Sequence, residues 1–309
     1  MFPQALQEPL RFLIGPTAVG KSATAMQLAL FHGLELISLD SMQVYTGMDI
    51  GTAKPSAAEQ AAVRHHMLDR VSPHERYDVS RYLGDLGEVE SQLAERAARA
   101  VHIGGTGFYL KARLAGLFDG PAVDAALRAT LEQRYEQEGA AALHAQLTAV
   151  DPASAARLHA NDRKRIVRAL EVYLQTARPL SEWQQQWSAT PKPARIVGLT
   201  LAVGELDRRI VERVRAMLSS GWVEEVRALD AQGWLGPTAA QALGYGEVRA
   251  LSRGELSLSA CVDAISLATR QFARKQRTWW RKFDVNWIDV AQHRDPAERA
   301  ALVASHFEL

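Results

Sequence analysis

The sequence has few of the features that mark several classes of protein. Its 309 residues include one cysteine, Cys261, which excludes an internal disulfide and a zinc site built from several cysteines. No run of eighteen apolar residues occurs, so no segment is long enough to span a membrane as a helix. The N-terminus has no basic segment leading into a long apolar stretch. We therefore expect no signal peptide and a reducing, cytoplasmic setting.

Neither sign of charge is in excess, because 36 lysines and arginines face 35 aspartates and glutamates, for a net charge of +1. Overall charge therefore argues neither for nor against a nucleic-acid partner, and only local clustering can do so. Apolar residues make up 47% of the chain and charged residues 23%, which is typical of a soluble globular enzyme. The length suffices for one large α/β domain and a smaller one.

A complete phosphate-loop motif follows a short apolar run near the N-terminus. The pattern G-x-x-x-x-G-K-[ST] is matched by Gly15-Pro16-Thr17-Ala18-Val19-Gly20-Lys21-Ser22. In such a loop, backbone N–H groups converge on an oligophosphate, the lysine adds a charge, and the Ser22 hydroxyl can bind Mg²⁺. The alternative is a plain glycine turn. It is disfavoured because 10–14 reads as a buried strand and 23–32 as a helix that Gly33 ends.

Strands alternate with helices along most of the chain. We expect strands at 10–14, 34–39, 67–71, 101–103 and 195–201. Helices are expected at 23–32, 79–100 and 108–114, and then over most of the chain to about residue 283, with a break at 233–237. This order predicts an α/β fold with a parallel sheet, whose functional residues gather at the carboxyl ends of the strands.

Between about residues 119 and 190 the composition changes to alanine, charged residues and other helix formers, with no convincing strand. We interpret this segment as a helical insertion domain, with 1–118 and 191–309 forming the core domain. After a cap at Asn161-Asp162, the helical spacing places three apolar residues on one face: Ile166, Leu170 and Tyr173. Arg165 and Arg168 lie off that stripe and are expected to point outward.

Asp40 ends the second predicted strand, beside the phosphate loop. A carboxylate there can hold Mg²⁺ through water or accept a proton from a nucleophile, although it could equally cap the next turn. Gln43 has both a donor and an acceptor, which suits reading the edge of a base. In the glycine-rich turn 104–107, Thr106 could donate to a phosphate or a substrate, but turns of this kind are often only tight connections.

Two predicted helices carry clusters of basic residues. One has Arg163, Lys164, Arg165 and Arg168, and the other has Arg270, Arg274, Arg277 and Arg281. Such helices suit contact with a polyanion backbone, and the alternative is a solvated charged face. On the second helix a separate apolar stripe is expected at Ile265, Ala268, Phe272 and Trp279. Gln276 interrupts it, which disfavours membrane-surface binding. His65-His66 is not expected to bind metal, because neighbouring strand residues face opposite ways.

Taken together, the motifs resemble those of the tRNA dimethylallyltransferases, also called tRNA isopentenyltransferases. Besides the phosphate loop, the matching segments are 40–45 (DSMQVY), 47–55 (GMDIGTAKP), 104–109 (GGTGFY), 161–162, 165–166, 168–171 and 242–245 (ALGY). They occur in family order between about residues 10 and 283, and the run 49–55 is far more specific than the phosphate loop. The zinc finger that eukaryotic relatives append is missing, so we expect the bacterial type.

This resemblance implies a P-loop NTPase-like core and transfer of a dimethylallyl group from dimethylallyl diphosphate to N6 of the adenosine 3′-adjacent to the tRNA anticodon, with Mg²⁺ as cofactor. The diphosphate would bind the loop 15–22, Asp40 would accept the proton of the amine, and Thr106 would position the reactants. Arg213, or its neighbour Arg209, would steady the diphosphate, and we choose Arg213. The implied tRNA contacts are Asp40, Ser41, Met42, Gln43, Thr106, Arg128, Lys164, Arg165, Ile166, Val167 and Arg168. A monomer is expected.

Two other functions use the same residues. A small-molecule P-loop kinase would bind ATP in the loop, use Asp40 as base for a hydroxyl, and use the insertion as a lid. A nucleotide-dependent switch or RNA-binding module would need no catalysis, but the guanine motif N-K-x-D is absent. The run 49–55 and the two basic helices favour the tRNA-modifying enzyme over both.

Overall fold

A computed structural model describes residues 9–117, 120–184 and 192–309. Its centre is a six-stranded sheet in the order β3-β2-β4-β1-β5-β6, in which every neighbouring pair is parallel. The strands are β1 (Leu10–Ile14), β2 (Glu35–Leu39), β3 (His65–His66), β4 (Ala100–Gly104), β5 (Ala194–Thr200) and β6 (Asn286–Asp289). The predicted parallel α/β sheet is confirmed.

The central strand β1 shows why the sheet needs helices on both faces. Side chains alternate along a strand, so Leu13 joins one hydrophobic cluster while Phe12 and Ile14 join the other. All three are fully buried. A strand that is apolar on both sides is stable only when both faces are covered, which is the usual state of a parallel sheet.

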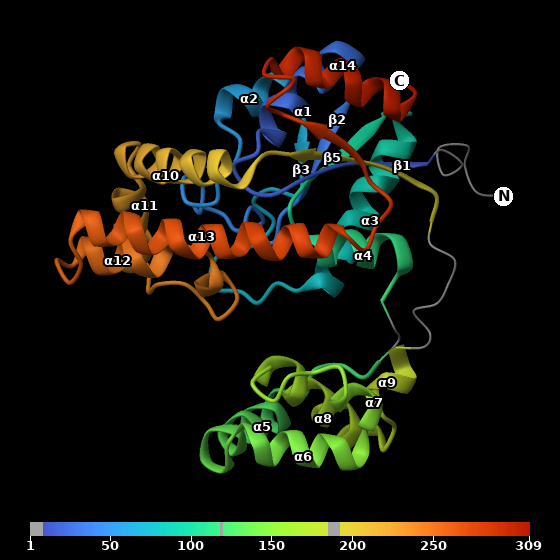
Figure 1. The fold of residues 1–309 in the computed structure, drawn as a ribbon, viewed down its shortest axis with the longest axis vertical. Helices are drawn as coiled ribbons and strands as arrows, with labels where there is room; N and C mark the ends of the chain where they lie inside the picture. The colour runs from blue at the N-terminus through green and yellow to red at the C-terminus, as the bar shows by residue number, and fades with distance from the viewer. Residues whose placement is uncertain (1–8, 118–119, 185–191) are drawn as a thin grey trace. The chain divides into compact units, whose positions relative to one another are not determined.

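Helices of the core unit supply that cover (Figure 1). α1 and α14 pack on one face of the sheet, and α3, α4 and α13 pack on the other. The helices are α1 (Lys21–His32), α2 (Ala57–Ala62), α3 (Val79–Glu95), α4 (Gly107–Ala115), α10 (Val203–Ser219), α11 (Trp222–Ala231), the 3-10 helix η3 (Ala239–Gln241), α12 (Tyr245–Ser252), α13 (Leu258–Trp280) and α14 (Pro296–Phe307). Throughout the part of the chain that the structure describes, no helix is both long enough and apolar enough to cross a membrane.

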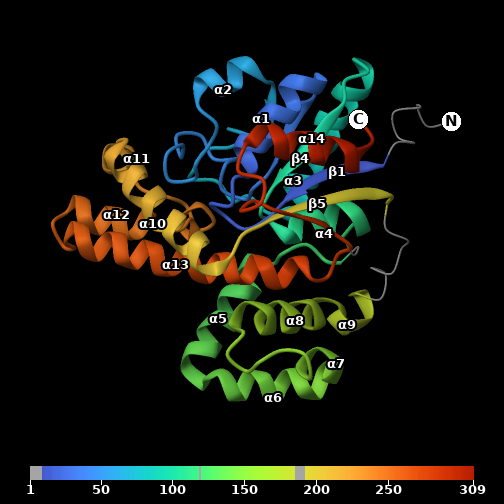
Figure 2. The same cartoon turned by 45° about the horizontal axis from the view of Figure 1, so that its top comes forward.

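The long helix α13 lies beside α10 and α12 (Figure 2). Its buried face differs from the predicted apolar stripe, because Ala273, Gln276 and Trp280 are buried while Phe272 is 39% exposed. Apolar spacing identifies a helical face, whereas the neighbours that cover each turn are set by the fold, so Phe272 belongs to the predicted stripe and is still exposed.

Residues Ala115–Pro191 form a second compact unit. It consists of α5 (Ala125–Glu138), α6 (Ala140–Val150), α7 (Pro152–Ala155), α8 (Arg163–Thr176) and α9 (Leu180–Trp183). These helices enclose a hydrophobic cluster of their own, with members such as Leu131, Leu143, Leu147 and Leu170. The predicted limits at 118/119 and 190/191 lie outside the described residues.

Local backbone conformations explain two errors in the predicted elements. A strand was expected at 67–71, but Met67 and Asp69 adopt left-handed conformations (φ 63° and 49°), and Val71 makes only an isolated bridge to Tyr45. Left-handed residues cannot continue a strand. The helix expected to reach residue 100 ends at Glu95, and Ala97 is left-handed (φ 50°). Nothing was predicted for β6 and α14.

Candidate active site

Three loops that follow neighbouring parallel strands meet at the carboxyl edge of the sheet. The phosphate loop follows β1, Asp40 follows β2, and the glycine turn that contains Thr106 follows β4, which lies between them. The Thr106 N–H donates to Leu39 O at 3.1 Å, so the turn is tied to the end of β2. Ligands of open α/β sheets bind at this edge, as the sequence analysis expected.

The phosphate loop has the backbone geometry that its glycines predict. Gly15 has φ 150°, and a Cβ added there would lie 2.7 Å from Leu199 O, so no larger residue fits. Lys21 Nζ folds back and donates to Gly15 O at 3.0 Å and to Pro16 O at 2.8 Å. The loop therefore curls around its own lysine at the start of α1, where the helix amides favour an anion.

A cavity of about 460 Å³ opens beside this loop. The predicted site residues in its wall are Thr17, Lys21, Ser22, Asp40, Ser41, Met42, Gln43, Thr106 and Arg213. An apolar part of the wall is formed by Val214, Met217, Trp222, Leu243, Ile265 and Phe272. The structure thus places the phosphate-loop motif, a carboxylate and an apolar surface in one hollow, which suits a ligand with an anionic and an apolar end.

Charged groups in this cavity alter one another's protonation. Burial raises the pKa of the Asp40 carboxyl, although Oδ1 accepts the Met42 N–H at 2.8 Å and the positive charges of Lys21 and Arg213 oppose the rise. Burial and the charge of Arg213 lower the pKa of Lys21 to about 7, against the opposing effect of Asp40. A carboxylate that binds a proton more readily than usual is suited to act as a general base.

Arg213 and Arg209 lie on the same helix, α10, but only Arg213 lines the cavity. Its Nη1 lies 3.4 Å from Thr17 Oγ1 in the phosphate loop. Arg209 instead donates to Val19 O at 3.4 Å and pairs with Glu205. This arrangement favours Arg213 as the arginine that faces a bound diphosphate.

Gln43 lies in the wall, but its amide is already engaged. Its Oε1 accepts from the Ser38 hydroxyl at 2.8 Å, and its Nε2 donates to the carbonyls of Thr52 and Ala53 at 3.2 and 3.1 Å. In the structure the side chain holds the loop 49–55 against β2. Reading of a base edge by Gln43 would compete with these contacts.

Glu225 on α11 organises the same loop from the other side. Its carboxylate accepts the N–H groups of Asp49, Ile50 and Gly51 at 2.9, 2.6 and 3.3 Å, and the Tyr245 hydroxyl at 2.7 Å. These bonds join the segments 49–55 and 242–245, which are separate motifs in the sequence. Glu225 was missed because nothing in its local sequence distinguishes it from other helical glutamates.

Trp222, on the same helix as Glu225, packs into the space that two glycines leave. A Cβ on Gly51 would lie 2.3 Å from Trp222 Nε1, and one on Gly244 would lie 2.3 Å from its Cη2. Close approach to this buried indole explains why both positions are glycine. The glycines of the two motifs thus serve a single packing contact in the cavity wall.

Gln276 connects the two glycine-rich loops. Its Oε1 accepts the Thr17 N–H at 2.9 Å, and its Nε2 donates to Gly105 O at 3.0 Å. The side chain is buried and lines the cavity. In the sequence it was only an interruption of an apolar stripe. A polar residue at a buried helical position was the signal that could have identified it.

On α8 of the insertion unit, the predicted RNA contacts fall into two groups. Ile166 and Val167 are 0% and 2% exposed within the hydrophobic cluster of that unit, so their side chains are not accessible there, and the predicted tRNA contact at these two positions stays a prediction. Arg165 is exposed and pairs with Asp162, the cap of α8. Lys164 is also exposed. These two side chains are in a position to meet a polyanion.

The other two predicted arginines of this unit serve a structural contact. Arg128 and Arg168 both pair with Glu171, whose side chain is fully buried, at 2.5 and 3.1 Å. Arg168 also donates to Pro121 O at 2.7 Å. Arg168 was expected to point freely outward, and this expectation was wrong because a buried carboxylate requires cationic partners.

The oxygen ligands that Mg²⁺ prefers are available in the cavity, in the Ser22 hydroxyl and the Asp40 carboxylate. Among the described residues, no group of three or more His, Cys, Asp or Glu is gathered for a metal ion. These residues are consistent with a Mg²⁺ ion that has few protein ligands and takes several of its other ligands from the oxygens of a diphosphate.

The two neighbouring histidines have other partners. His66 pairs with Glu35 at 2.6 Å, and His65 bonds to Val63 O.

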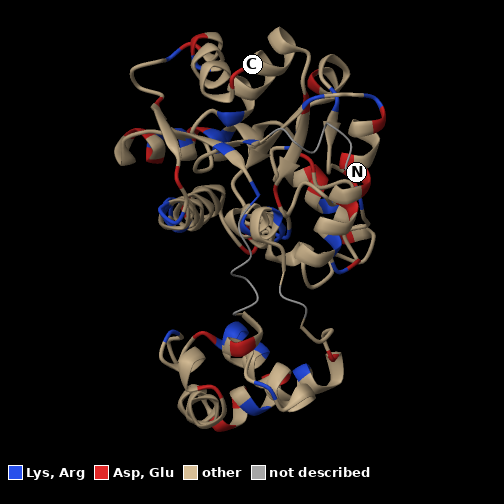
Figure 3. Cartoon of the chain, turned by 90° about the vertical axis from the view of Figure 1, so that its right-hand side faces the viewer, with Lys and Arg blue, Asp and Glu red and all other residues tan. Residues whose placement is uncertain are grey.

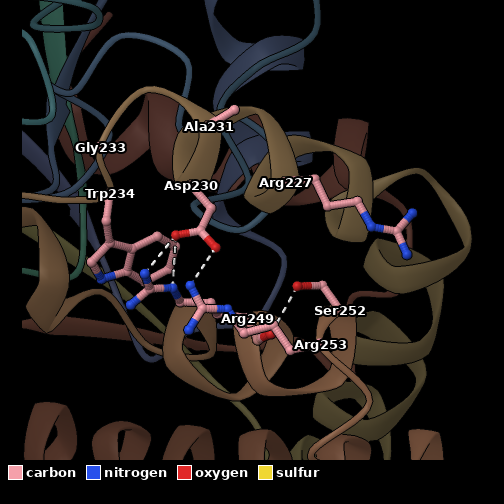
Figure 4. A pocket seen from close by; sticks show the side chains of 8 residues that line it. All are labelled: Arg227, Asp230, Ala231, Gly233, Trp234, Arg249, Ser252 and Arg253. Atoms are coloured by element: carbon pink, nitrogen blue, oxygen red, sulfur yellow. Dashed lines mark hydrogen bonds and ion pairs between the residues drawn. The ribbon is translucent and has the colours of Figure 1, made fainter.

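A second hollow lies between α11 and α12 (Figure 4). Its charged groups satisfy one another, because Asp230 accepts from Arg249 and Arg253 while Arg249 also lies 4.2 Å from the Trp234 ring. Both basic and acidic positions occur on the helices of each unit (Figure 3). Asp230, Arg249 and Arg253 of this hollow are therefore already paired with one another.

Comparison with known proteins identifies the family. The model of the IPP transferase family matches residues 43–283, and that of isopentenyl transferase matches residues 8–75. The chain belongs to the IPP transferase family. A relative from Geobacter sulfurreducens, named tRNA dimethylallyltransferase, is 44% identical over 93% of this chain and 94% of its own length. One of the same name from Symbiobacterium thermophilum is 45% identical over 91% of this chain and 89% of its own.

Solved structures of the IPP transferase family share the fold. The full-length tRNA isopentenylpyrophosphate transferase of Bacillus halodurans superposes with a TM-score of 0.69 at 33% identity, covering 98% of this chain and 97% of that one. A eukaryotic dimethylallyltransferase acting on tRNA gives 0.80 at 26% identity, covering 97% and 79%. The predicted family and the P-loop NTPase-like fold are thus confirmed. The kinase alternative is not favoured.

Proposed function

We propose that this protein transfers a dimethylallyl group from dimethylallyl diphosphate to N6 of the adenosine 3′-adjacent to the tRNA anticodon. One observation carries the proposal: a phosphate loop and a carboxylate of raised pKa line one cavity with an apolar wall. Relatives named tRNA dimethylallyltransferase, which match this chain over nine-tenths of its length, support it. Family and site together favour tRNA over a small-molecule acceptor.

The donor end of the cavity would stabilise the leaving group. An allylic carbon bonded to diphosphate reacts only when the charge that develops on the diphosphate is neutralised. The N–H groups of the phosphate loop, the ammonium of Lys21 and the guanidinium of Arg213, all in or beside the cavity wall, would do this. Mg²⁺, held by Ser22, would add charge neutralisation when bound.

The acceptor end would activate the nucleophile. The exocyclic amine of adenine is a weak nucleophile because its lone pair is delocalised into the ring. As the new N–C bond forms and the C–O bond to diphosphate breaks, the amine proton passes to Asp40, whose raised pKa favours this. Thr106, in the same wall, would position the reactants.

The RNA must present a single base to a hollow in the protein. A base can enter only after it leaves its stack, so we expect a splayed anticodon loop. The exposed cations Lys164 and Arg165 on α8 would contact the backbone, together with basic residues of α13. We further propose that the protein acts in the cytoplasm as a monomer.

The deciding experiment incubates the protein with tRNA and dimethylallyl diphosphate, and separately with tRNA and ATP, followed by nucleoside analysis. Prenylated adenosine is expected only with the prenyl donor. Lys21→Ala should sharply reduce transfer but leave most of the tRNA affinity, because the RNA contacts lie elsewhere. Consumption of ATP without prenylation, or equal loss of tRNA binding in the variant, would contradict the proposal.

A further inference from the structure

Arg299 on α14 lies directly behind the phosphate loop. Its side chain is 3% exposed, and its Nε donates to Thr24 Oγ1 on α1 at 2.8 Å. The Thr24 hydroxyl in turn donates to Gly20 O at 3.2 Å. A Cβ added to Gly20 would lie 3.5 Å from Arg299 Nη2. The guanidinium is therefore connected to the residue that precedes Lys21 and Ser22.

The charge of Arg299 has no carboxylate partner among the residues that the structure describes. Its Nη1 donates to backbone carbonyls, those of His293 and Arg294, at 2.8 and 2.7 Å. Of the nearby acids, Asp295 caps α14 and Glu298 bonds to His293 at 2.7 Å. A buried, unpaired cation is costly, and burial lowers the pKa of this guanidinium.

Arg209 offers a contrast at the same loop. It donates to Val19 O, one residue before Gly20, but it is paired with Glu205. Of these two arginines, the one on α14 is thus the one that has no ion pair among the described residues, and the negative charges of Asp295 and Glu298 only partly offset the effect of burial on its pKa. A dianion bound at the N-terminus of α1 would add negative charge close to it.

We propose that Arg299 is a positioning residue for the diphosphate: it holds the first turn of α1 through Thr24, and its charge raises the positive potential of the phosphate loop. This role depends on the proposed function in one respect only, because the proposed function identifies the bound anion as a diphosphate. It brings α14, which lies beyond the residues 43–283 matched by the IPP transferase model, into the donor site.

The test uses the full chain with Arg299→Met and Arg299→Lys, and inorganic pyrophosphate as the probe in isothermal titration. At an effective dielectric constant near 20, a unit charge about 10 Å from a bound anion changes the affinity for that anion by roughly tenfold. Arg299→Met should therefore weaken pyrophosphate binding by about that factor. Arg299→Lys should restore much of it. In steady-state assays the KM for dimethylallyl diphosphate should rise, while tRNA affinity stays within about twofold.

Arg195→Met is the matched control. Arg195 also contacts the end of α14, through Glu308, and its replacement removes one positive charge. It should leave pyrophosphate affinity unchanged. Should Arg299→Met fail to fold, Thr24→Val removes the same contact without removing the charge, and a lower pyrophosphate affinity is expected there as well.

Unchanged pyrophosphate affinity in folded Arg299→Met, or in Thr24→Val, would overturn the role, as would an equal loss in Arg195→Met. These outcomes are separable from failure of the proposed function. A wild-type chain that binds pyrophosphate but prenylates no adenosine refutes that function. The role of Arg299 is then still tested by the pyrophosphate affinities of its variants.

Discussion

Lys21 and Asp40 have opposite charges and perturbed pKa values in the wall of one cavity. Burial shifts both toward their neutral forms, and their mutual attraction opposes the shift. A bound diphosphate would change this balance because it favours the charged lysine. Binding of the donor should therefore be coupled to protonation of Lys21.

We predict that pyrophosphate binding at pH 8 takes up a proton at Lys21. The pKa of this lysine is about 7 in the free chain, so above pH 7 it is largely neutral, and the anion must raise that pKa. Below pH 6 Lys21 is already charged and takes up no proton. Titration calorimetry in buffers of different ionisation enthalpy measures the uptake. Because pyrophosphate itself exchanges protons, the difference from Lys21→Met is the relevant quantity, and no difference would refute the prediction.

Asp40→Asn separates catalysis from turn capping. Asparagine can still accept the Met42 N–H that Asp40 Oδ1 now accepts at 2.8 Å, so thermal stability should stay near normal. It cannot take up the amine proton, and loss of a general base typically costs about 10²–10⁴ in turnover. We expect single-turnover transfer to fall about a hundredfold or more, with tRNA and pyrophosphate still bound. Near-normal turnover would show that Asp40 only caps the turn.

At the scale of elements, α8 shows that two arginines one turn apart can have different roles. Arg165 has an exposed side chain, 66% accessible, whereas Arg168 is 24% accessible and pairs with fully buried Glu171. The spacing of the helix places both off the apolar stripe. Arg168 has a structural role because Glu171, on the same helix, is buried and pairs with it as well as with Arg128 from α5.

Accordingly, Arg165→Ala and Arg168→Ala should differ. Arg165→Ala should weaken tRNA binding and lower its salt slope by about one unit, with little change in stability. Arg168→Ala removes a partner of a buried charge, so it should destabilise the insertion unit by roughly 1–3 kcal/mol. Salt-dependent binding assays and chemical denaturation measure the two effects. An unchanged slope in Arg165→Ala would mean that this face of α8 is only solvated.

At the scale of the whole molecule, the insertion leaves and rejoins the core unit at one place. The Lys192 N–H donates to Leu114 O at 3.0 Å, so the ends of the core chain already meet. The insertion unit, Ala115–Pro191, has its own hydrophobic cluster and the core unit has two others. These are the properties of an inserted domain that folds around its own core.

Replacing residues 115–191 with a short glycine-serine linker should therefore leave a folded core. We expect cooperative thermal unfolding and pyrophosphate affinity within about threefold of the full chain, because the phosphate loop and Arg213 belong to the core unit. Binding of tRNA should fall by about tenfold or more as the phosphate contacts of α8 are lost. Calorimetry, titration and filter binding give the three values. Loss of pyrophosphate binding in a folded variant would show that the donor site needs the insertion.

Much of the framework follows from the sequence alone. The apolar run 10–14, the glycines of the phosphate loop and the cap at Asp162 specify local structure, because propensity, capping and backbone freedom act over a few residues. The resemblance to the tRNA dimethylallyltransferases put Asp40, Thr106 and Arg213 among the predicted site residues, and the structure places all three in the wall of the cavity.

Tertiary structure decided the rest. Glu225 holds the loop 49–55 from 174 or more residues away, and Gln276 joins Thr17 to Gly105 across distances of 259 and 171 residues. Exposure of Phe272 likewise depends on which elements pack over it. The helical period determines which side chains share a face. Only the packed fold determines whether that face meets a buried charge, a loop, a cavity or water.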